Sequence, residues 1–380
     1  MIPSGPGRGG AEPVHILNGT PFATAYATAL DVAAREHLVL VIKGTFRFPE
    51  REGAPLEPAE EQQEPVLADV HWGEPGHSPP RQEAEFARFK PRCDLLVNGT
   101  GWAPGGRPAE RVKVGVACGP VRKLIEVVGD RHWRQAGATV GPSAPAPFLS
   151  LPLTYARAFG GVDDADPEEA QPLAYAANPF GRGWHRVANQ GRILGRPLPN
   201  LEHPGEPVSV PWGTYRPAGL GIRARSVPER LRFAGTYDQR WIDEVFPFLP
   251  ADFDERYHQA APEDQQLPWP AGGEEVVLLN LTPEGRMRFA LPVVELPVVF
   301  LRRDGSRVEQ RPVLDTILVE PDARRVCLTW RTSLPLRRDL FEVPEAVVGP
   351  MSRAFWRARE LGKTYLPSLS ALDRRGGEGP

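Results

Sequence analysis

Alternating apolar and polar positions mark the clearest strand signal in this sequence. Between residues 111 and 118 every second position is apolar, which places those side chains on one face of an extended chain. They are Val112, Val114, Val116 and Cys118. Gly119-Pro120 follows as a turn signal, and an apolar pattern resumes over residues 121–128. We therefore predict a β-hairpin over residues 110–128.

Further β-rich runs occur on both sides of a long irregular stretch. They cover residues 39–48, 93–98, 276–281, 298–303, 313–320 and 325–331. Between them, residues 135–230 contain many prolines and glycines and no long periodic segment. Aromatic residues such as Trp184 and Trp212 fall in this stretch, and aromatics seldom occur in mere linkers. We interpret it as an ordered but irregular insertion.

The predicted fold class is mainly β, with two β-sandwich-like lobes joined by the irregular Pro/Gly-rich insertion and a short C-terminal helix. The predicted organisation is a flexible arm (1–12), an N-terminal β lobe (13–134), the insertion (135–230), a C-terminal β lobe (231–335), a helical segment (336–372) and a flexible tail (373–380).

Two segments have helical patterns. Residues 251–257 predict a short helix capped by an Asp, and residues 350–361 predict a longer one that ends before Gly362. The longer one has Met351, Phe355, Ala358 and Leu361 on one stripe. This amphipathic segment either covers a sheet edge, which we favour, or docks on a partner.

Composition narrows the classes of function. The 44 prolines and 38 glycines, spread along the chain, favour many turns and short helices. The 45 Lys and Arg residues against 48 Asp and Glu residues leave a net charge of −3, which argues against nucleic-acid binding. No apolar run approaches the roughly 18 residues that span a bilayer, and the first ten residues lack a signal-peptide pattern. Three cysteines without metal-ligand spacing indicate reduced, buried thiols, so we expect a cytoplasmic protein.

The common catalytic signatures are absent, and we predict no catalytic residues, cofactor or metal. His71 and His77 flank a turn and are interpreted as ordinary loop histidines rather than metal ligands. The acidic residues 163–169 favour a solvated loop over a calcium site. A carbohydrate-active or other hydrolytic enzyme remains an alternative. It would use carboxylates from Asp164, Asp166, Asp252 and Asp254.

Several short sequence motifs occur along the chain in an order that is typical of a known family. They are Lys43-Gly-Thr-Phe46, Lys90-Pro-Arg-Cys-Asp94, Gly129-Asp-Arg-His-Trp133, residues 151–161, Asn178-Pro-Phe-Gly-Arg-Gly183, Gly235-Thr-Tyr-Asp-Gln-Arg-Trp241 and Leu249-Pro-Ala-Asp-Phe-Asp254. Over residues 20–335 the chain resembles a bacterial family catalogued as a domain of unknown function. Genes of that family lie beside the VgrG and PAAR-type spike genes of type VI secretion.

The resemblance implies a non-enzymatic adaptor or chaperone that helps load a toxic effector or a PAAR-type tip onto the VgrG spike. The expected partner is thus a VgrG, a PAAR-type protein or an effector. A structural component of the secreted spike is a further alternative. The candidate partner-binding or motif residues are Tyr155, Arg157, Phe159, Gly160, Gly161, Asn178, Arg182, Tyr237, Asp238 and Trp241. Arginine and aromatic side chains are frequent at the centres of protein interfaces, whereas the glycines serve the backbone.

Overall fold

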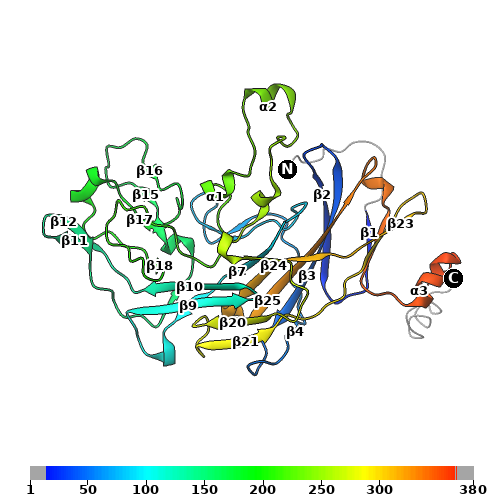
Figure 1. Cartoon of the computed structure of the whole chain (residues 1–380), viewed down its shortest axis with the longest axis horizontal. Coiled ribbons are helices and arrows are strands. Elements are labelled where there is room, and N and C mark those ends of the chain that lie inside the picture. The colour runs from blue at the N-terminus through cyan, green and yellow to red at the C-terminus, as the bar shows by residue number, and fades with distance from the viewer. Residues whose placement is uncertain (1–13, 364, 366–380) are drawn as a thin grey trace, which may run out of the picture. The chain divides into compact units, whose positions relative to one another are not determined.

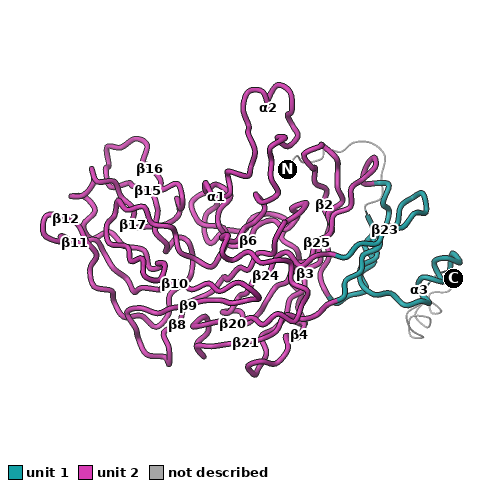
Figure 2. The backbone as a smooth tube through the Cα atoms, viewed as in Figure 1, with its two compact units in different colours: residues 1–21, 295–311, 341–380 teal, residues 22–294, 312–340 magenta. Residues whose placement is uncertain are grey.

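The computed structural model describes residues 14–363 and residue 365. Within these residues the protein is mainly β with a short C-terminal helix, which confirms this part of the predicted fold class. The predicted flexible arm (1–12) and flexible tail (373–380) lie outside the described residues, as does the end of the predicted helical segment. The chain forms two compact units, shown in Figure 2. Unit 1 comprises residues 1–21, 295–311 and 341–380, and unit 2 comprises residues 22–294 and 312–340.

A seven-stranded sheet is the largest element of unit 2 (Figure 1). Its order is β19 (Gln266–Leu267), β7 (Cys93–Val97), β24 (Val313–Glu320), β25 (Arg325–Pro335), β3 (Glu36–Arg47) and β2 (Ala23–Leu30), with β4 (Glu57–Pro58) beside β3. Only β7 and β24 run parallel. The central strands β3, β24 and β25 are buried along almost their whole length, so both faces of the sheet are covered.

A five-stranded sheet contains the hairpin that the sequence predicted. Its order is β18 (Leu201–Glu202), β10 (Val121–Val128), β9 (Arg111–Cys118), β20 (Glu275–Leu279) and β21 (Arg286–Ala290). β9 and β10 pair antiparallel along their full length, and Gly119 takes the positive φ of 54° that the tight turn requires. The predicted hairpin is confirmed.

Both sheets combine strands from the two predicted β lobes. In the larger sheet β3 lies beside β25, nearly 300 residues later, and in the smaller one β9 lies beside β20. The stretches 13–134 and 231–335 are therefore not separate sheets. The physical reason is that alternation reports which residues are extended, whereas pairing depends on contacts between residues far apart in the chain.

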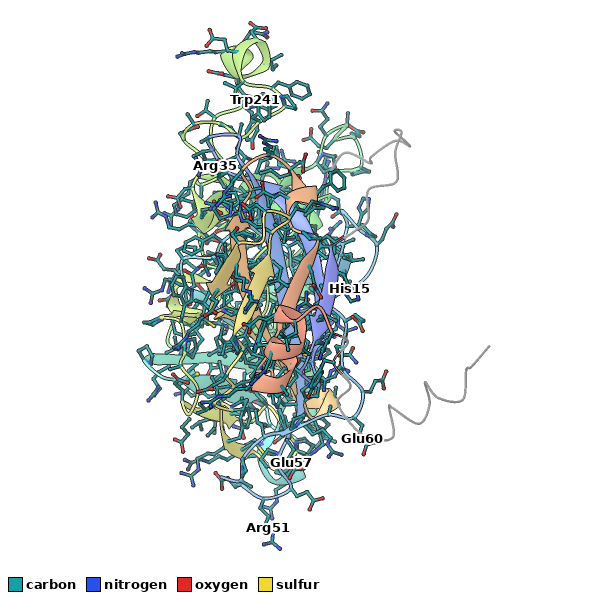
Figure 3. All side chains as sticks on the ribbon, turned by 90° about the vertical axis from the view of Figure 1, so that its right-hand side faces the viewer. His15, Arg35, Arg51, Glu57, Glu60 and Trp241 are labelled. Carbon is teal, nitrogen blue, oxygen red and sulfur yellow. The ribbon has the colours of Figure 1, made fainter. Side chains whose placement is uncertain are left out.

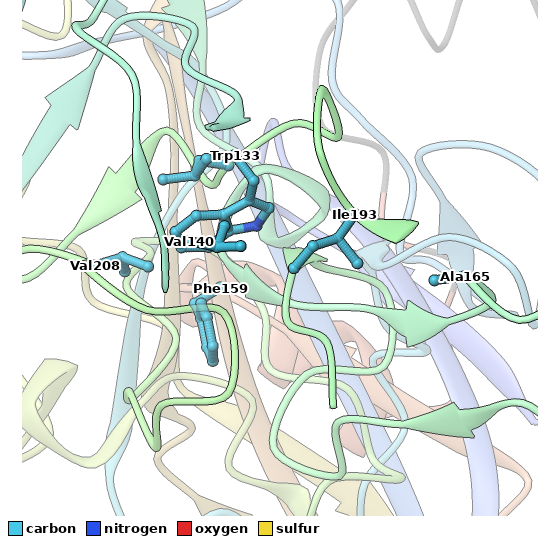
Figure 4. Packing of buried hydrophobic residues seen from close by; sticks show 7 residues of the cluster. Trp133, Val140, Phe159, Ala165, Ile193 and Val208 are labelled. Atoms are coloured by element: carbon cyan, nitrogen blue, oxygen red, sulfur yellow. The ribbon is translucent and has the colours of Figure 1, made fainter. Parts of the chain in front are cut away.

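The stretch between residues 133 and 231 folds with very short elements. Besides β18, they are β11 (Trp133–Ala136), β12 (Thr139–Pro142), β13 (Ser150–Pro152), η2 (Tyr155–Arg157), β14 (Phe159–Gly160), β15 (Val162–Asp163), β16 (Leu173–Ala174), β17 (Arg182–Gly183), η3 (Val187–Arg192) and α1 (Pro228–Leu231). Seven buried side chains form a hydrophobic cluster here, among them Trp133, Phe159 and Ile193 (Figure 4). Apolar burial of this kind orders a backbone that lacks long regular elements.

Unit 1 contains a four-stranded sheet and the predicted C-terminal helix. The sheet order is β1 (His15–Asn18), β26 (Glu345–Val348), β22 (Val298–Leu301) and β23 (Arg307–Gln310). Helix α3 (Arg353–Glu360) begins after Ser352, whose Oγ accepts a hydrogen bond from the Phe355 N–H at 3.1 Å. Phe355 packs against Val299 and Val347 on a face of the sheet, whereas Leu361 is exposed. The helix thus acts as a cover within its own unit.

The remaining described elements are short. They are β5 (Val70–His71), β6 (Pro80–Gln82), β8 (Thr100–Trp102), η1 (Pro104–Gly106), α2 (Gln239–Glu244), η4 (Glu255–His258), η5 (Glu263–Gln265), η6 (Pro321–Ala323) and η7 (Leu340–Glu342). Cys93, Cys118 and Cys327 are all buried free thiols, as predicted. None of the described helices has the length and apolar character to cross a membrane.

Candidate functional site

Four polar residues form a row across one face of the seven-stranded sheet. Lys43 on β3 lies opposite Thr329 on β25, which lies opposite Thr316 on β24, which lies opposite Asp94 on β7. Residues opposite one another on adjacent strands share a face. We call Lys43, Thr329, Thr316 and Asp94 the polar row. All four are buried.

Two further charged residues form hydrogen bonds and ion pairs with the side chains of the polar row. Glu85 accepts hydrogen bonds from the Lys43 Nζ and the Thr329 Oγ1, both at 2.8 Å. Lys90 Nζ donates to Asp94 Oδ2 at 2.8 Å and to Thr316 Oγ1 at 3.0 Å. The strings that begin at Lys43 and at Lys90 therefore meet on one sheet face. Their buried charges are paired and hydrogen-bonded, which is the condition for tolerating them in a core.

A pocket opens beside the polar row. Its wall is partly apolar, with Leu96, Ile222 and Leu318, and partly polar, with Lys43 and His258. Burial lowers the pKa of His258 to about 3, and the positive charges of Arg331 and Lys90 act in the same direction. His258 is thus neutral in the folded protein over the physiological pH range.

This pKa predicts a pH-dependent stability. In the unfolded chain a histidine titrates near its ordinary pKa of about 6.5. As the pH falls from about 6.5 towards 3, His258 becomes protonated in the unfolded state but stays neutral in the folded state. Because the unfolded state then binds more protons, the free energy of unfolding decreases. We expect His258→Gln to show a smaller loss than the wild type between pH 6.5 and 4.5 in urea titrations. Equal losses in the two proteins would contradict this assignment.

The predicted residues of the 155–183 region meet around Asn178. Asn178 is buried, and its Nδ2 donates hydrogen bonds to the backbone carbonyls of Tyr155 at 2.8 Å and Phe159 at 3.1 Å. Tyr155 and Phe159 are buried as well, and the Arg223 guanidinium lies 4.7 Å from the centre of the Tyr155 ring. These contacts support the fold directly. Partner contact by these three side chains stays a prediction.

Gly160 and Gly161 allow two chain segments to approach closely. Their φ angles are +143° and +101°, in the region that favours glycine. A Cβ at Gly160 would collide with the Asn178 carbonyl oxygen, and one at Gly161 would meet the Gly181 carbonyl oxygen. The Gly161 N–H donates to the Asn178 carbonyl at 2.9 Å. The strings 151–161 and 178–183 therefore build one backbone junction.

Arg157 and Arg182 differ from their neighbours because they reach the surface. Their side chains are 30% and 25% exposed. Both guanidinium groups donate a hydrogen bond to the Oδ1 of Asn200, Arg157 at 2.8 Å. We call Arg157 and Arg182 the arginine pair.

Residues 235–252 form an arm that projects from unit 2, with α2 at its far end (Figure 1). Asp252 closes its base by accepting hydrogen bonds from the Thr236 N–H at 2.9 Å and the Thr236 Oγ1 at 2.7 Å. Just beyond, the Asp254 N–H donates to the Phe233 carbonyl at 3.0 Å. The strings 235–241 and 249–254 thus supply the two sides of this base.

Aromatic residues gather at the end of the arm. Asp238 caps α2 by accepting a hydrogen bond from the Trp241 N–H at 2.8 Å. The Trp241 ring lies 4.7 Å from the Tyr237 ring and 5.5 Å from the Phe246 ring, centre to centre. Figure 3 shows Trp241 on the projecting segment. Tyr237, Ile242 and Phe246 are 52%, 55% and 65% exposed.

Such a set of exposed side chains on one short segment is unusual, because exposed apolar residues normally occur singly. The arm therefore presents an apolar surface that the described chain does not cover. The side chains at its centre are of the types that dominate protein interfaces. We regard the arm as the candidate functional site.

The arm was only partly foreseen. The string 235–241 drew attention to Tyr237, Asp238 and Trp241, but the exposed Ile242 and Phe246 were not singled out. The short helix expected over residues 251–257 is a 3-10 helix, η4, that begins after Asp254. No periodic pattern marks a six-residue helix such as α2, so only the aromatic residues of the string pointed to it.

The candidate acidic residues have partners that suit a scaffold. Asp164 pairs with Arg196 and Asp166 with Arg192, while Asp254 caps η4. In contrast to the solvated loop that the sequence predicts, Asp163 is fully buried and accepts hydrogen bonds from His185, Arg186 and Asn189. Its partners lie more than 20 residues later, beyond the reach of local sequence reasoning.

In the part of the chain that the structure describes, no group of three or more His, Cys, Asp or Glu residues could hold a metal ion.

The family model of an uncharacterized protein conserved in bacteria, DUF2169, matches residues 33–331. The chain belongs to this family. The match covers all of the region over which the motif strings occur, from Lys43 to Asp254, and so includes both sides of the arm base. Searches of the curated proteins and of the solved structures found no significant match to this DUF2169 chain.

Proposed function

We propose that this DUF2169 protein is a non-enzymatic adaptor that binds another protein through the arm. The observation that carries the proposal is the cluster of exposed Tyr237, Ile242 and Phe246 around Trp241. Burying these side chains against a partner would stabilise a complex by roughly 25 cal/mol for each Å² of apolar surface removed from water.

The construction of the arm supports a binding role. Its base is held by the Thr236–Asp252 hydrogen bonds, and its tip by the Asp238 cap and the hydrogen bond from Trp241 Nε1 to the Phe248 carbonyl at 3.0 Å. These contacts organise the apolar side chains before a partner arrives. Preorganisation lowers the entropic cost of association.

We further propose that the partner belongs to the type VI secretion spike: a VgrG, a PAAR-type protein or a toxic effector that is loaded onto it. The support is the resemblance of the motif strings, because the strings that close the arm base are among those that carry it. The adaptor acts in the cytoplasm and stays behind when the spike is secreted.

The test is affinity capture from the native host. Ile242→Ser with Phe246→Ser removes two exposed apolar side chains that make no hydrogen bond through their side chains. We expect the recovered partner to fall at least tenfold, because truncating a central interface residue costs about 2 kcal/mol or more. Mass spectrometry of the captured proteins identifies the partner.

A matched control is Leu173→Ser with Val187→Ser, which changes two similarly exposed residues away from the arm, 53% and 57% exposed. This control is expected to recover the partner at the wild-type level. Undiminished capture by the arm variant would contradict the proposal. Recovery of the protein itself in the medium with the spike would instead support a structural component.

A further inference from the structure

We infer that the arginine pair forms a binding site for an oxyanion, a carboxylate or a phosphate group. The site is built from Arg157, Arg182 and the buried Asn200. It lies in the 155–202 region and is independent of the arm and of the proposed adaptor function.

Asn200 is held so that its oxygen faces the two arginines. Its Nδ2 donates to the Val128 carbonyl at 2.9 Å and to Asp130 Oδ1 at 3.0 Å, which leaves Oδ1 directed at Arg157 and Arg182. Each guanidinium carries five N–H donors. Among the described residues, each arginine of the pair donates one side-chain hydrogen bond, and both bonds go to this one neutral oxygen.

The positive charge of the pair is only weakly compensated. Asp130 Oδ1 lies 3.7 Å from the nearest nitrogen of each arginine, beyond hydrogen-bond distance, and its side chain is 71% exposed. Ion pairs with so exposed a partner contribute little. The buried Glu202 forms an ion pair with the neighbouring Arg131, with 2.7 Å between Glu202 Oε1 and Arg131 Nη2. Its negative charge therefore compensates Arg131 rather than the arginine pair.

Two further observations agree with an anion-binding site. Burial lowers the pKa of Arg182 to about 10, and the positive charge of Arg157 acts in the same direction, against the opposing charge of Asp130. The Arg182 Nε is buried and has no hydrogen-bond partner within the described structure. A bound oxyanion could accept a hydrogen bond from this nitrogen and offset the charge of the two arginines.

The ligand chemistry follows from guanidinium geometry. Its planar fork matches two oxygens of a carboxylate or a phosphate, and such charge-assisted bonds are about twice as strong as neutral ones. A single carboxylate or phosphate group could thus bridge the two arginines and displace the exposed Asp130 carboxylate. An acidic protein segment and a phosphorylated ligand both offer this group.

Isothermal titration of the full chain with inorganic phosphate, and separately with succinate, at constant ionic strength tests the inference. We expect Arg157→Gln and Arg182→Gln to weaken binding at least tenfold, since a hydrogen bond to a charged group contributes about 1.5–3 kcal/mol. The control Arg311→Gln removes a positive charge from another exposed position and is expected to bind like the wild type.

A second measurement needs no variant. Phenylglyoxal labels exposed arginines, and peptide mapping of the wild-type protein reports each site; phosphate or succinate is expected to protect Arg157 and Arg182 but not Arg311. Protection by phosphate alone supports a phosphoryl ligand, and protection by succinate supports an acidic segment. Absence of protection by both anions, or equal loss of binding in Arg311→Gln, overturns the inference. The arm variant is expected to retain anion binding, so failure of this inference can be distinguished from failure of the proposed adaptor function.

Discussion

Replacing Asp94 by alanine is expected to lower the free energy of unfolding by about 3–5 kcal/mol. Asp94 is fully buried and accepts four hydrogen bonds: from Lys90 Nζ at 2.8 Å, from Gln259 Nε2 at 2.6 Å, and from the backbone N–H groups of Ala260 and Ala261 at 2.9 and 3.2 Å. The variant leaves the Lys90 ammonium buried without its counter-charge. Urea denaturation of the two proteins measures the loss.

A double-mutant cycle separates this charge effect from the general cost of a cavity. Lys90→Met removes the charge that Asp94 compensates, so Lys90→Met with Asp94→Ala is expected to lose at least 1 kcal/mol less than the sum of the single changes. Strict additivity, or a loss below about 1 kcal/mol in Asp94→Ala, would contradict the prediction that the pairing of Lys90 with Asp94 stabilises the fold.

Gly160→Ala is the second change with a large expected effect, a loss of roughly 3 kcal/mol. Two costs combine: the φ of +143°, which a residue with a Cβ rarely adopts, and the collision of that Cβ with the Asn178 carbonyl oxygen. The collision is with backbone, so the junction between the strings 151–161 and 178–183 has to move apart. Thermal and urea unfolding both report this loss.

Gly195→Ala is the matched control for the cost of the positive φ alone. Gly195 also has a positive φ, +84°, but no heavy atom lies within 4 Å of a Cβ built there. We expect this variant to lose only about 1 kcal/mol. Equal losses at the two positions would mean that strain in φ, rather than close approach, accounts for the glycine at 160.

The motif strings serve distinct physical purposes in the folded chain. The strings that begin at Lys43 and Lys90 supply the polar row, and those at 151–161 and 178–183 build the glycine junction. Only the strings that contain Tyr237 and Asp252 lead to an exposed apolar surface.

Local patterns in the sequence were sufficient for the mainly β class, the hairpin predicted over residues 110–128, the buried cysteines and the C-terminal helix predicted over residues 350–361. Each of these depends on neighbours along the chain: alternating apolar positions, a turn glycine, an apolar stripe at helical spacing. The irregular, Pro/Gly-rich character of residues 135–230 could also be recognised in the sequence. The hydrophobic cluster within this stretch could not, because its members are far apart along the chain.

Tertiary structure alone decided how the distant parts meet. It placed Lys43 opposite Thr329 and Thr316 opposite Asp94, and it brought Arg157 and Arg182 to one oxygen of Asn200. It also left the end of the arm uncovered. Strand register and the convergence of charged side chains arise from contacts between residues far apart in sequence. Such contacts produce no periodic pattern of apolar and polar residues along the sequence, so these sites could be recognised only in the folded chain.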